Sequence, residues 1–144
     1  MDAIPDLAKA YPQLNLRNAV AVGHSAGAQL AVWASTRQDL RQGEVGASPT
    51  FRPTTVISLA GPLDMRRAVA MGDKRIVRVL GGTPAQVPDR YASVDPIQNL
   101  DPQTPVIAVA GTSDHVVPHV LSQDYVAADA KAGGRARAKS WCRA

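Results

Sequence analysis

A serine stands at the centre of the stretch Gly23-His24-Ser25-Ala26-Gly27, between a short apolar run and a segment with helical spacing. A serine on a sharp turn between a strand and a helix presents its hydroxyl at the edge of the sheet, at a cost in backbone strain of about 1–3 kcal/mol. We expect the two glycines to remove Cβ atoms that would clash across this turn. The next residue opens the helix, so its amide can stabilise a developing oxyanion. The pattern predicts Ser25 as a nucleophile and Ala26 as an oxyanion-hole donor; the alternative is a glycine-lined turn without a catalytic part.

A carboxylate follows a second apolar run, in the stretch Gly111-Thr112-Ser113-Asp114. Parallel strands place their sites at their carboxyl ends, where Ser25 would also lie. Asp114 can therefore orient and stabilise an imidazole beside the serine. The alternative is a cap on the helix that starts just after it, and the two roles are compatible. Asp64, in "GPLD", is another possible acid, for which we favour a helix cap.

A serine nucleophile also needs a general base that takes the proton of its hydroxyl, and the sequence offers three histidines for this role. A base must come within about 3 Å of the nucleophile. His24 adjoins Ser25, but side chains diverge at such a turn, and we expect it to be a packed core histidine. His115 and His119 follow Asp114, and either would have to swing toward Ser25 to act; otherwise they belong to a loop and a helix start. Loss of the base from a serine triad costs about 10⁴ to 10⁶ in rate.

The elements that would position these residues alternate between strands and helices. Short apolar runs typical of buried strands cover 19–22, 54–60 and 105–110. Helical spacing covers 2–10, 26–37 and 118–132, and short helices and turns fill 64–100. This alternation indicates βαβ units in a parallel sheet, for which we expect helices on both faces.

Composition excludes several classes of protein. The 144 residues are 45% hydrophobic and 19% charged, which is ordinary for one globular domain. No apolar run approaches the roughly 20 residues that span a bilayer, and the first residues lack the pattern of a signal peptide, so we expect a cytoplasmic protein without a membrane partner. The single cysteine, Cys142, excludes an internal disulfide. Because no metal-ligand cluster or phosphate-binding glycine motif is present, we expect no cofactor and no metal.

The net charge of +4 comes from one end of the chain. Every acidic residue precedes residue 130, whereas five basic residues and no acidic one follow it. This distribution is typical of a solvated basic tail, and we expect no nucleic-acid partner. Five other basic residues between 66 and 78 would lie over the site, where they could favour an acidic substrate, although a solvated helix face is the favoured interpretation. They are Arg66, Arg67, Lys74, Arg75 and Arg78.

Four stretches carry a family resemblance: "AVAVGHSAGAQLAVWAS", "ISLAGPLDM", "YASVDPIQNL" and "PVIAVAGTSDHVVPHVLSQDYVAADAKAGG". Together they resemble the C-terminal half of an α/β-hydrolase, in the esterase, feruloyl-esterase and kynurenine-formamidase-like branch near the prolyl-oligopeptidase hydrolases. The resemblance covers residues 1–134 and implies a serine hydrolase of carboxylic esters or small amides that works through an acyl-enzyme. It implies Ser25 as nucleophile, Asp114 as triad acid and Ala26 as one oxyanion-hole amide, with a small-molecule ester or amide as the partner.

The sequence departs from that family pattern at both ends. The catalytic histidine would follow one more strand after Asp114, yet no histidine follows His119. Residues 135–144, "RARAKSWCRA", alternate basic with small residues, so we expect a basic tail and no buried strand. The H-G-G segment that supplies the second oxyanion amide is absent before Gly23. These departures predict an α/β-hydrolase fold truncated at both ends, and an alternative function as a non-catalytic remnant or interaction module.

The truncated pattern also predicts how copies of the chain would meet. Residues 19–22 would form a strand without a partner on one side. An unpaired apolar edge invites pairing with another chain, so we expect self-association.

Overall fold

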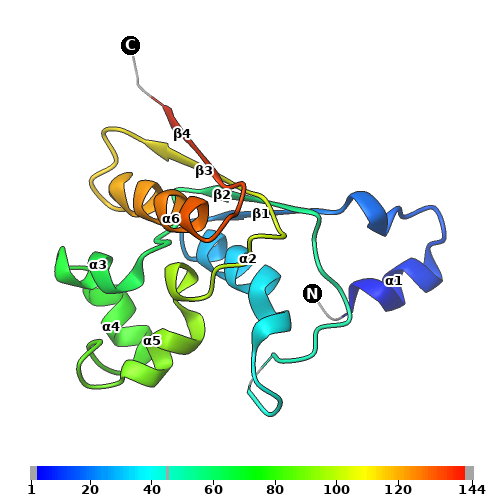
Figure 1. Ribbon diagram of the computed structural model, residues 1–144, viewed down its shortest axis with the longest axis horizontal. Coiled ribbons are helices and arrows are strands. Elements are labelled where there is room, and N and C mark those ends of the chain that lie inside the picture. Colours follow the sequence, from blue (N-terminus) through cyan, green and yellow to red (C-terminus); the bar gives the residue numbers. More distant parts are fainter. Residues whose placement is uncertain (1–2, 45, 142–144) are drawn as a thin grey trace.

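The computed structural model describes residues 3–44 and 46–141. Cys142, Asp2 and the last residues of the 135–144 segment lie outside this part of the chain. At its centre is a four-stranded parallel sheet with the strand order β1-β2-β3-β4 (Figure 1). The strands are β1 (Val20–His24), β2 (Thr55–Leu59), β3 (Val106–Gly111) and β4 (Arg137–Trp141).

Helices connect the strands in sequence order. The two longest are α2 (Ala26–Thr36), between β1 and β2, and α6 (Val120–Lys131), between β3 and β4. A cluster of three short helices lies between β2 and β3: α3 (Met65–Ala70), α4 (Lys74–Leu80) and α5 (Pro88–Val94). The remaining helical segments are α1 (Ile4–Ala10) and the 3₁₀ turns η1 (Leu16–Asn18), η2 (Arg37–Asp39) and η3 (Pro96–Gln98). None of the described helices is both long and apolar enough to cross a bilayer.

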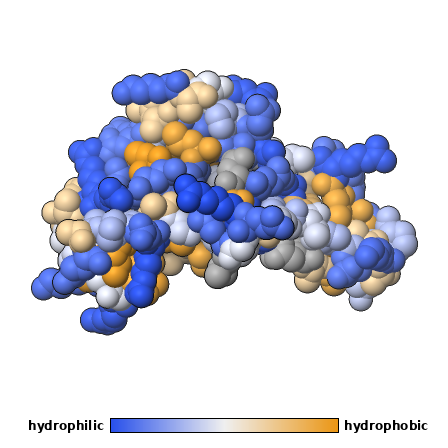
Figure 2. All heavy atoms as spheres, turned by 60° about the horizontal axis from the view of Figure 1, so that its bottom comes forward, coloured by the Kyte–Doolittle hydropathy of each residue, from blue (hydrophilic) through white to orange (hydrophobic). Residues whose placement is uncertain are grey.

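The core lies between the sheet and its two long helices. Burial alternates along β2 and β3, and the register places Val56 beside Val106 on the buried face. Val32 of α2 and Tyr125 of α6 belong to the same buried cluster as Val56 and Val106. Figure 1 shows α2 and α6 on the same side of the sheet. A second cluster joins the short helices to the start of α6, through residues that include Met65, Ile76, Tyr91 and Leu121. The side of the molecule that lies at the bottom of Figure 1 is turned toward the viewer in Figure 2, where it is mostly hydrophilic with smaller hydrophobic patches.

The expected parallel α/β sheet is confirmed, but the long helices cover one face of it. Strands that follow one another in sequence order across a sheet all step in the same direction, and right-handed crossovers then place every connecting helix on the same side. Helices on both faces require a reversal of strand order, which the described residues do not contain. The opposite face, which we call the open face, carries alternate strand residues, and Val20 and Val22 are 52% and 60% exposed there.

Part of the basic segment near the C-terminal end, which we expected to be a tail, forms a strand; as expected, this strand is not buried. β4 pairs with β3 in parallel, and all five of its residues are exposed. An edge strand needs backbone partners on one side only and tolerates charged side chains, so a basic sequence can form it. Arg137 and Lys139 lie beside Ile107 and Val109 on the open face. The sheet therefore has four strands, and within the described part of the chain β1 is the other edge, as expected.

A buried carboxylate fixes the short helices against the loop before β3. Asp95 is completely buried, and its side chain accepts hydrogen bonds from the Met65 N–H at 2.9 Å and from Gln98 Nε2 at 2.8 Å. Burial raises the pKa of Asp95, and these hydrogen bonds offset only part of that rise. The carboxylate thus holds the start of α3, which lies next to the Ser25 turn.

Candidate functional site

Ser25 forms the turn between β1 and α2. Its backbone has φ 53° and ψ −124°, a left-handed conformation that residues other than glycine rarely adopt. The Ser25 N–H donates to the Leu59 carbonyl at 2.9 Å, and the Ser25 carbonyl accepts from the Ala28 and Gln29 N–H groups at 3.0 and 3.3 Å. The strained turn is therefore held from both sides, by the end of β2 and by the first turn of α2.

The two flanking glycines contribute unequally to this turn. A Cβ on Gly23 would lie 2.1 Å from the Gly27 carbonyl oxygen, so only glycine fits there. A Cβ on Gly27 would meet nothing within 4 Å. The expectation that both glycines relieve a clash is therefore correct for Gly23 and wrong for Gly27. Gly27 takes part in the close approach through its backbone carbonyl, and a side chain on it would point into open space.

Ser25 and Ala26 open onto a cavity of about 150 Å³. The Ala26 N–H makes no hydrogen bond within the described residues, as is usual for the first amides of a helix. A charged pair, Asp73 and Arg75, lies at one side of this cavity, and Gln29 also lines it. The rest of the wall is apolar: Pro62, Met65, Ile76, Val79 and Val117. An acyl carbonyl placed between the hydroxyl and the free amide would thus have a largely apolar surround.

Asp114 lies in the loop after β3, at the carboxyl ends of the parallel strands, where Ser25 also lies. Its Oδ1 accepts the N–H groups of Val116 at 2.8 Å and Val117 at 2.9 Å. The Val117 N–H, with further help from Val116 and from the charges of His115 and His24, lowers the pKa of the Asp114 carboxyl against the opposing effect of burial. Asp114 does not cap α6, which begins at Val120. It caps the turn before that helix instead, and its Oδ2 makes no hydrogen bond to any described residue.

The three histidines lie in three different places. His24 is exposed on the open face, because the alternation along β1 turns it away from the core; the expectation of a packed histidine is wrong. His115 is an exposed loop residue that lines a neighbouring cavity of about 340 Å³. His119, at the start of α6, lines a separate cavity beside β4. None of the three lines the cavity that Ser25 and Ala26 share.

The remaining charged residues of the region cap helices or face solvent. Asp64 caps α3 and accepts the Arg67 N–H at 2.8 Å, so its predicted role as a cap is confirmed. Arg67 pairs with Asp124 of α6. Of the five basic residues between 66 and 78, Arg75 alone lines the two cavities described above.

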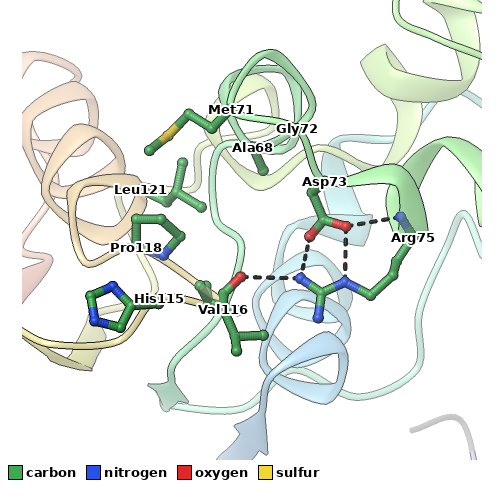
Figure 3. A pocket seen from close by; sticks show the side chains of 10 residues that line it. Ala68, Met71, Gly72, Asp73, Arg75, His115, Val116, Pro118 and Leu121 are labelled. Carbon is green, nitrogen blue, oxygen red and sulfur yellow. Dashed lines mark hydrogen bonds and ion pairs between the residues drawn. The ribbon is translucent and has the colours of Figure 1, made fainter.

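Sequence reasoning missed the pairing of Arg75 with Asp73. The Arg75 Nε and Nη2 donate to the two Asp73 carboxylate oxygens at 2.9 and 2.7 Å, and Nη2 also donates to the Val116 carbonyl at 3.1 Å (Figure 3). Asp73 also caps α4 by accepting the Arg75 N–H. The signal in the sequence is an aspartate two residues before an arginine at a helix start, but such a pair is common on surfaces and does not by itself indicate a cavity.

Comparisons with known proteins agree with this architecture. A sequence model of the BD-FAE family matches residues 4–128. A truncated carbohydrate esterase from gut microbiota superposes with a TM-score of 0.75 at 20% identity, covering 94% of this chain and 55% of that one. The acylaminoacyl peptidase of Pyrococcus horikoshii gives 0.76 at 18% identity, covering 98% and 22%. The bifunctional GH43-CE protein of Bacteroides eggerthii gives 0.74 at 27% identity, covering 94% and 20%. No curated protein matches the sequence.

The parallel sheet with its connecting helices, taken with these structural neighbours, shows an α/β-hydrolase fold. The family match spans most of the chain, and the chain belongs to the BD-FAE family. It spans about half the length of the first solved structures that it matches. The predicted relationship to the esterase branch of the superfamily is thereby confirmed.

Proposed function

We propose that this chain is a serine hydrolase of carboxylic esters or small amides, with Ser25 as its nucleophile. The observation that carries the proposal is the Ser25 turn: a non-glycine residue at φ 53° that lines a largely apolar cavity together with Ala26, the first residue of α2. Backbone strain of this kind persists where the surrounding structure holds it, and it clusters at functional sites. The relationship to esterases supports the same reaction class.

The chemistry divides into two acyl transfers. The Ser25 hydroxyl oxygen forms a bond to the substrate carbonyl carbon while a base takes its proton, and the Ala26 N–H donates to the resulting oxyanion. The carbon–oxygen or carbon–nitrogen bond then breaks, and the leaving alcohol or amine takes the proton from the base. Water repeats the sequence on the acyl-enzyme and releases the acid.

Asp114 would act through the base rather than on the substrate. Its Oδ1 is fixed by the loop amides of Val116 and Val117, and its Oδ2 is left to accept an imidazole N–H. The bases that the chain itself offers in this region are His115 and His119, which must move to reach Ser25 because each lines a different cavity in the structure. Asp114 is thus a positioning residue in this proposal.

A second function follows from the same histidine positions. A chain in which no histidine reaches Ser25 keeps the fold and the turn but loses most of the rate, by about 10⁴ to 10⁶. Such a chain would be a non-catalytic interaction module. Its specific support is that the Ser25 cavity contains no histidine among its lining residues.

Ester hydrolysis distinguishes the two functions. We expect the folded chain to hydrolyse p-nitrophenyl acetate with a burst of p-nitrophenol, and Ser25→Ala to abolish both burst and turnover. His115→Ala and His119→Ala show which histidine serves as base, because loss of the base lowers the rate as far as loss of Ser25. Turnover equal in the wild type and Ser25→Ala would contradict the proposal and favour the interaction module.

A further inference from the structure

The outer edge of β4 presents main-chain groups without a partner strand. Among the described residues β4 pairs with β3 only, and it forms one edge of the sheet (Figure 1). The Trp141 carbonyl accepts the Thr112 N–H at 3.1 Å, so the main-chain groups of Trp141 point toward β3. Peptide groups alternate in direction along a strand, so those of Ala138 and Ser140 point outward. An exposed row of this kind is a template for an added strand.

The chain is anchored where it enters this edge. Asp129 of α6 is 1% exposed, and its Oδ2 accepts the Ala136 N–H at 2.8 Å. A Cβ on Gly134 would lie 2.1 Å from the same oxygen, so the turn between α6 and β4 fits closely around the carboxylate. The outward row that stays open therefore begins at Ala138, on a strand whose start is fixed to the helix.

A cavity of about 250 Å³ lies beside the open edge, between β4 and the start of α6. Ala138 and Ser140 line it from the strand, and His119, Ser122 and Gln123 line it from the helix. The Ser122 side chain is 3% exposed, and its hydroxyl makes no hydrogen bond to any residue that the structure describes. When a peptide adds to a sheet edge, every second side chain points to the same face and can enter such a cavity.

The other face of the same edge is basic. Arg137 and Lys139 are exposed on the open face, and neither forms an ion pair with a described residue. Opposite charges that face one another across neighbouring strands stabilise the pairing, whereas like charges destabilise it. A second β4 strand would bring basic side chains against basic ones. The charge of the edge therefore favours a partner with carboxylates at alternate positions.

We propose that the outer edge of β4 binds an extended acidic segment of another protein, which adds to the sheet as a fifth strand. Main-chain hydrogen bonds to Ala138 and Ser140 hold the segment. Its carboxylates face Arg137 and Lys139, and a small polar side chain between them enters the cavity beside α6. This surface lies outside residues 4–128, which match the BD-FAE family, and its binding does not depend on the chemistry at Ser25.

Three peptides test the two parts of the surface. The probe is acetyl-Glu-Thr-Glu-Thr-Glu-amide; the second peptide carries lysine in place of glutamate, and the third is the probe with its main-chain amides N-methylated. We expect the probe to bind the full chain about tenfold more tightly than either control, because each control removes one source of affinity, charge or strand pairing. NMR titration gives the dissociation constants. Hydrogen exchange should slow at the Ala138 and Ser140 amides when the probe is bound.

Variants of the edge separate its charge from its main chain. The double variant Arg137→Glu with Lys139→Glu should reverse the preference and bind the lysine peptide more tightly than the probe. Lys131→Glu with Arg135→Glu is the matched control, since both residues are exposed, lie outside β4 and change the net charge equally. Ala138→Pro removes one outward N–H, which an edge strand tolerates, and should weaken probe binding. Circular dichroism establishes that each variant is folded.

Each outcome supports or overturns the proposal. A preference for the probe that the Arg137→Glu and Lys139→Glu pair reverses, with slowed exchange at Ala138 and Ser140, supports it. Equal affinity for the N-methylated peptide shows attraction by charge alone and overturns strand addition. Exchange at these two amides that slows with protein concentration, in the absence of peptide, assigns the edge to a second copy and also overturns it. A folded wild type that does not bind the probe has the same consequence.

Discussion

At the scale of single residues, the proposed chemistry rests on the backbone strain at Ser25 and on the hydrogen bonding of Asp114. Ser25 keeps a positive φ that costs about 1–3 kcal/mol, and the surrounding hydrogen bonds to Leu59, Ala28 and Gln29 hold it there. Asp114 has one oxygen engaged with the loop and the other without a partner in the described part of the chain. These two residues were predicted from the sequence because their short motifs follow apolar strands.

Asp114 offers a test that separates loop stabilisation from chemistry. Asp114→Asn keeps an oxygen acceptor for the Val116 and Val117 N–H groups and loses only the charge, so we expect a smaller loss of stability than in Asp114→Ala. Asp114→Ala leaves those amides without their acceptor and should lower the free energy of unfolding by about 0.5–2 kcal/mol. If Asp114 orients a base, both variants lose ester hydrolysis. Equal activity in Asp114→Asn and the wild type would restrict this residue to the loop.

Lowering the pH should change the free energy of unfolding in opposite directions through Asp114 and through Asp95. The pKa of Asp114 is lowered in the folded protein, so its stabilising contribution is present above the unfolded pKa of about 3.9 and is lost as the pH falls through the folded pKa. The pKa of Asp95 is raised by burial, so acidification between its folded pKa and about 3.9 stabilises the fold. In urea unfolding from pH 7 to pH 3, Asp114→Asn should flatten the loss of stability and Asp95→Asn should steepen it. The reverse order would contradict both assignments.

The histidines show where residue-level prediction stops. Their distance from Ser25 depends on the loop after β3 and on the strand alternation in β1, neither of which a short motif contains. Alternation alone would have placed His24 on the face opposite Ala21, away from the core. The contact of the Arg75–Asp73 ion pair with the Val116 carbonyl depends on how α4 packs near the loop after β3, a tertiary contact that the sequence pattern does not indicate.

At the scale of elements, three strands and both long helices lie within two residues of their predicted bounds. Hydrophobic periodicity and glycine or proline boundaries are sufficient for buried elements such as β2 and β3. The same criterion fails for β4, which is held by its backbone pairing with β3 and not by burial of its side chains. The side of the sheet on which the helices lie follows from strand order, which no single element encodes.

The turn between β1 and α2 gives a matched pair of substitutions. Gly23→Ala places a Cβ 2.1 Å from the Gly27 carbonyl oxygen, so we expect a loss of about 1–3 kcal/mol or more in the free energy of unfolding and displacement of Ser25. Gly27→Ala meets nothing within 4 Å and removes a glycine from a helix, so stability should hold or rise by about 0.5–1 kcal/mol. Thermal unfolding of the two variants measures the difference. Equal losses of stability in the two variants would contradict the close approach of Gly23 to the Gly27 carbonyl oxygen.

At the scale of the whole molecule, the open face and the β1 edge lack a described partner. We propose that copies of the chain associate through them, because the exposed Val20 and Val22 adjoin unpaired backbone groups of an edge strand. Val22→Lys should shift the chain from larger species toward monomer in sedimentation velocity without loss of the core. Leu30→Lys, at an exposed position of α2, is the control and should leave the distribution unchanged. A monomeric wild type would contradict this association.

The most direct test of the central claim is labelling of the folded chain with a fluorophosphonate, followed by mass-spectrometric mapping of the modified residue. The account predicts a phosphonylated Ser25 and no labelling of the Ser25→Ala variant. An unlabelled wild type in a sample shown to be folded by circular dichroism, or a label that persists in Ser25→Ala, would contradict the claim that Ser25 is an active nucleophile.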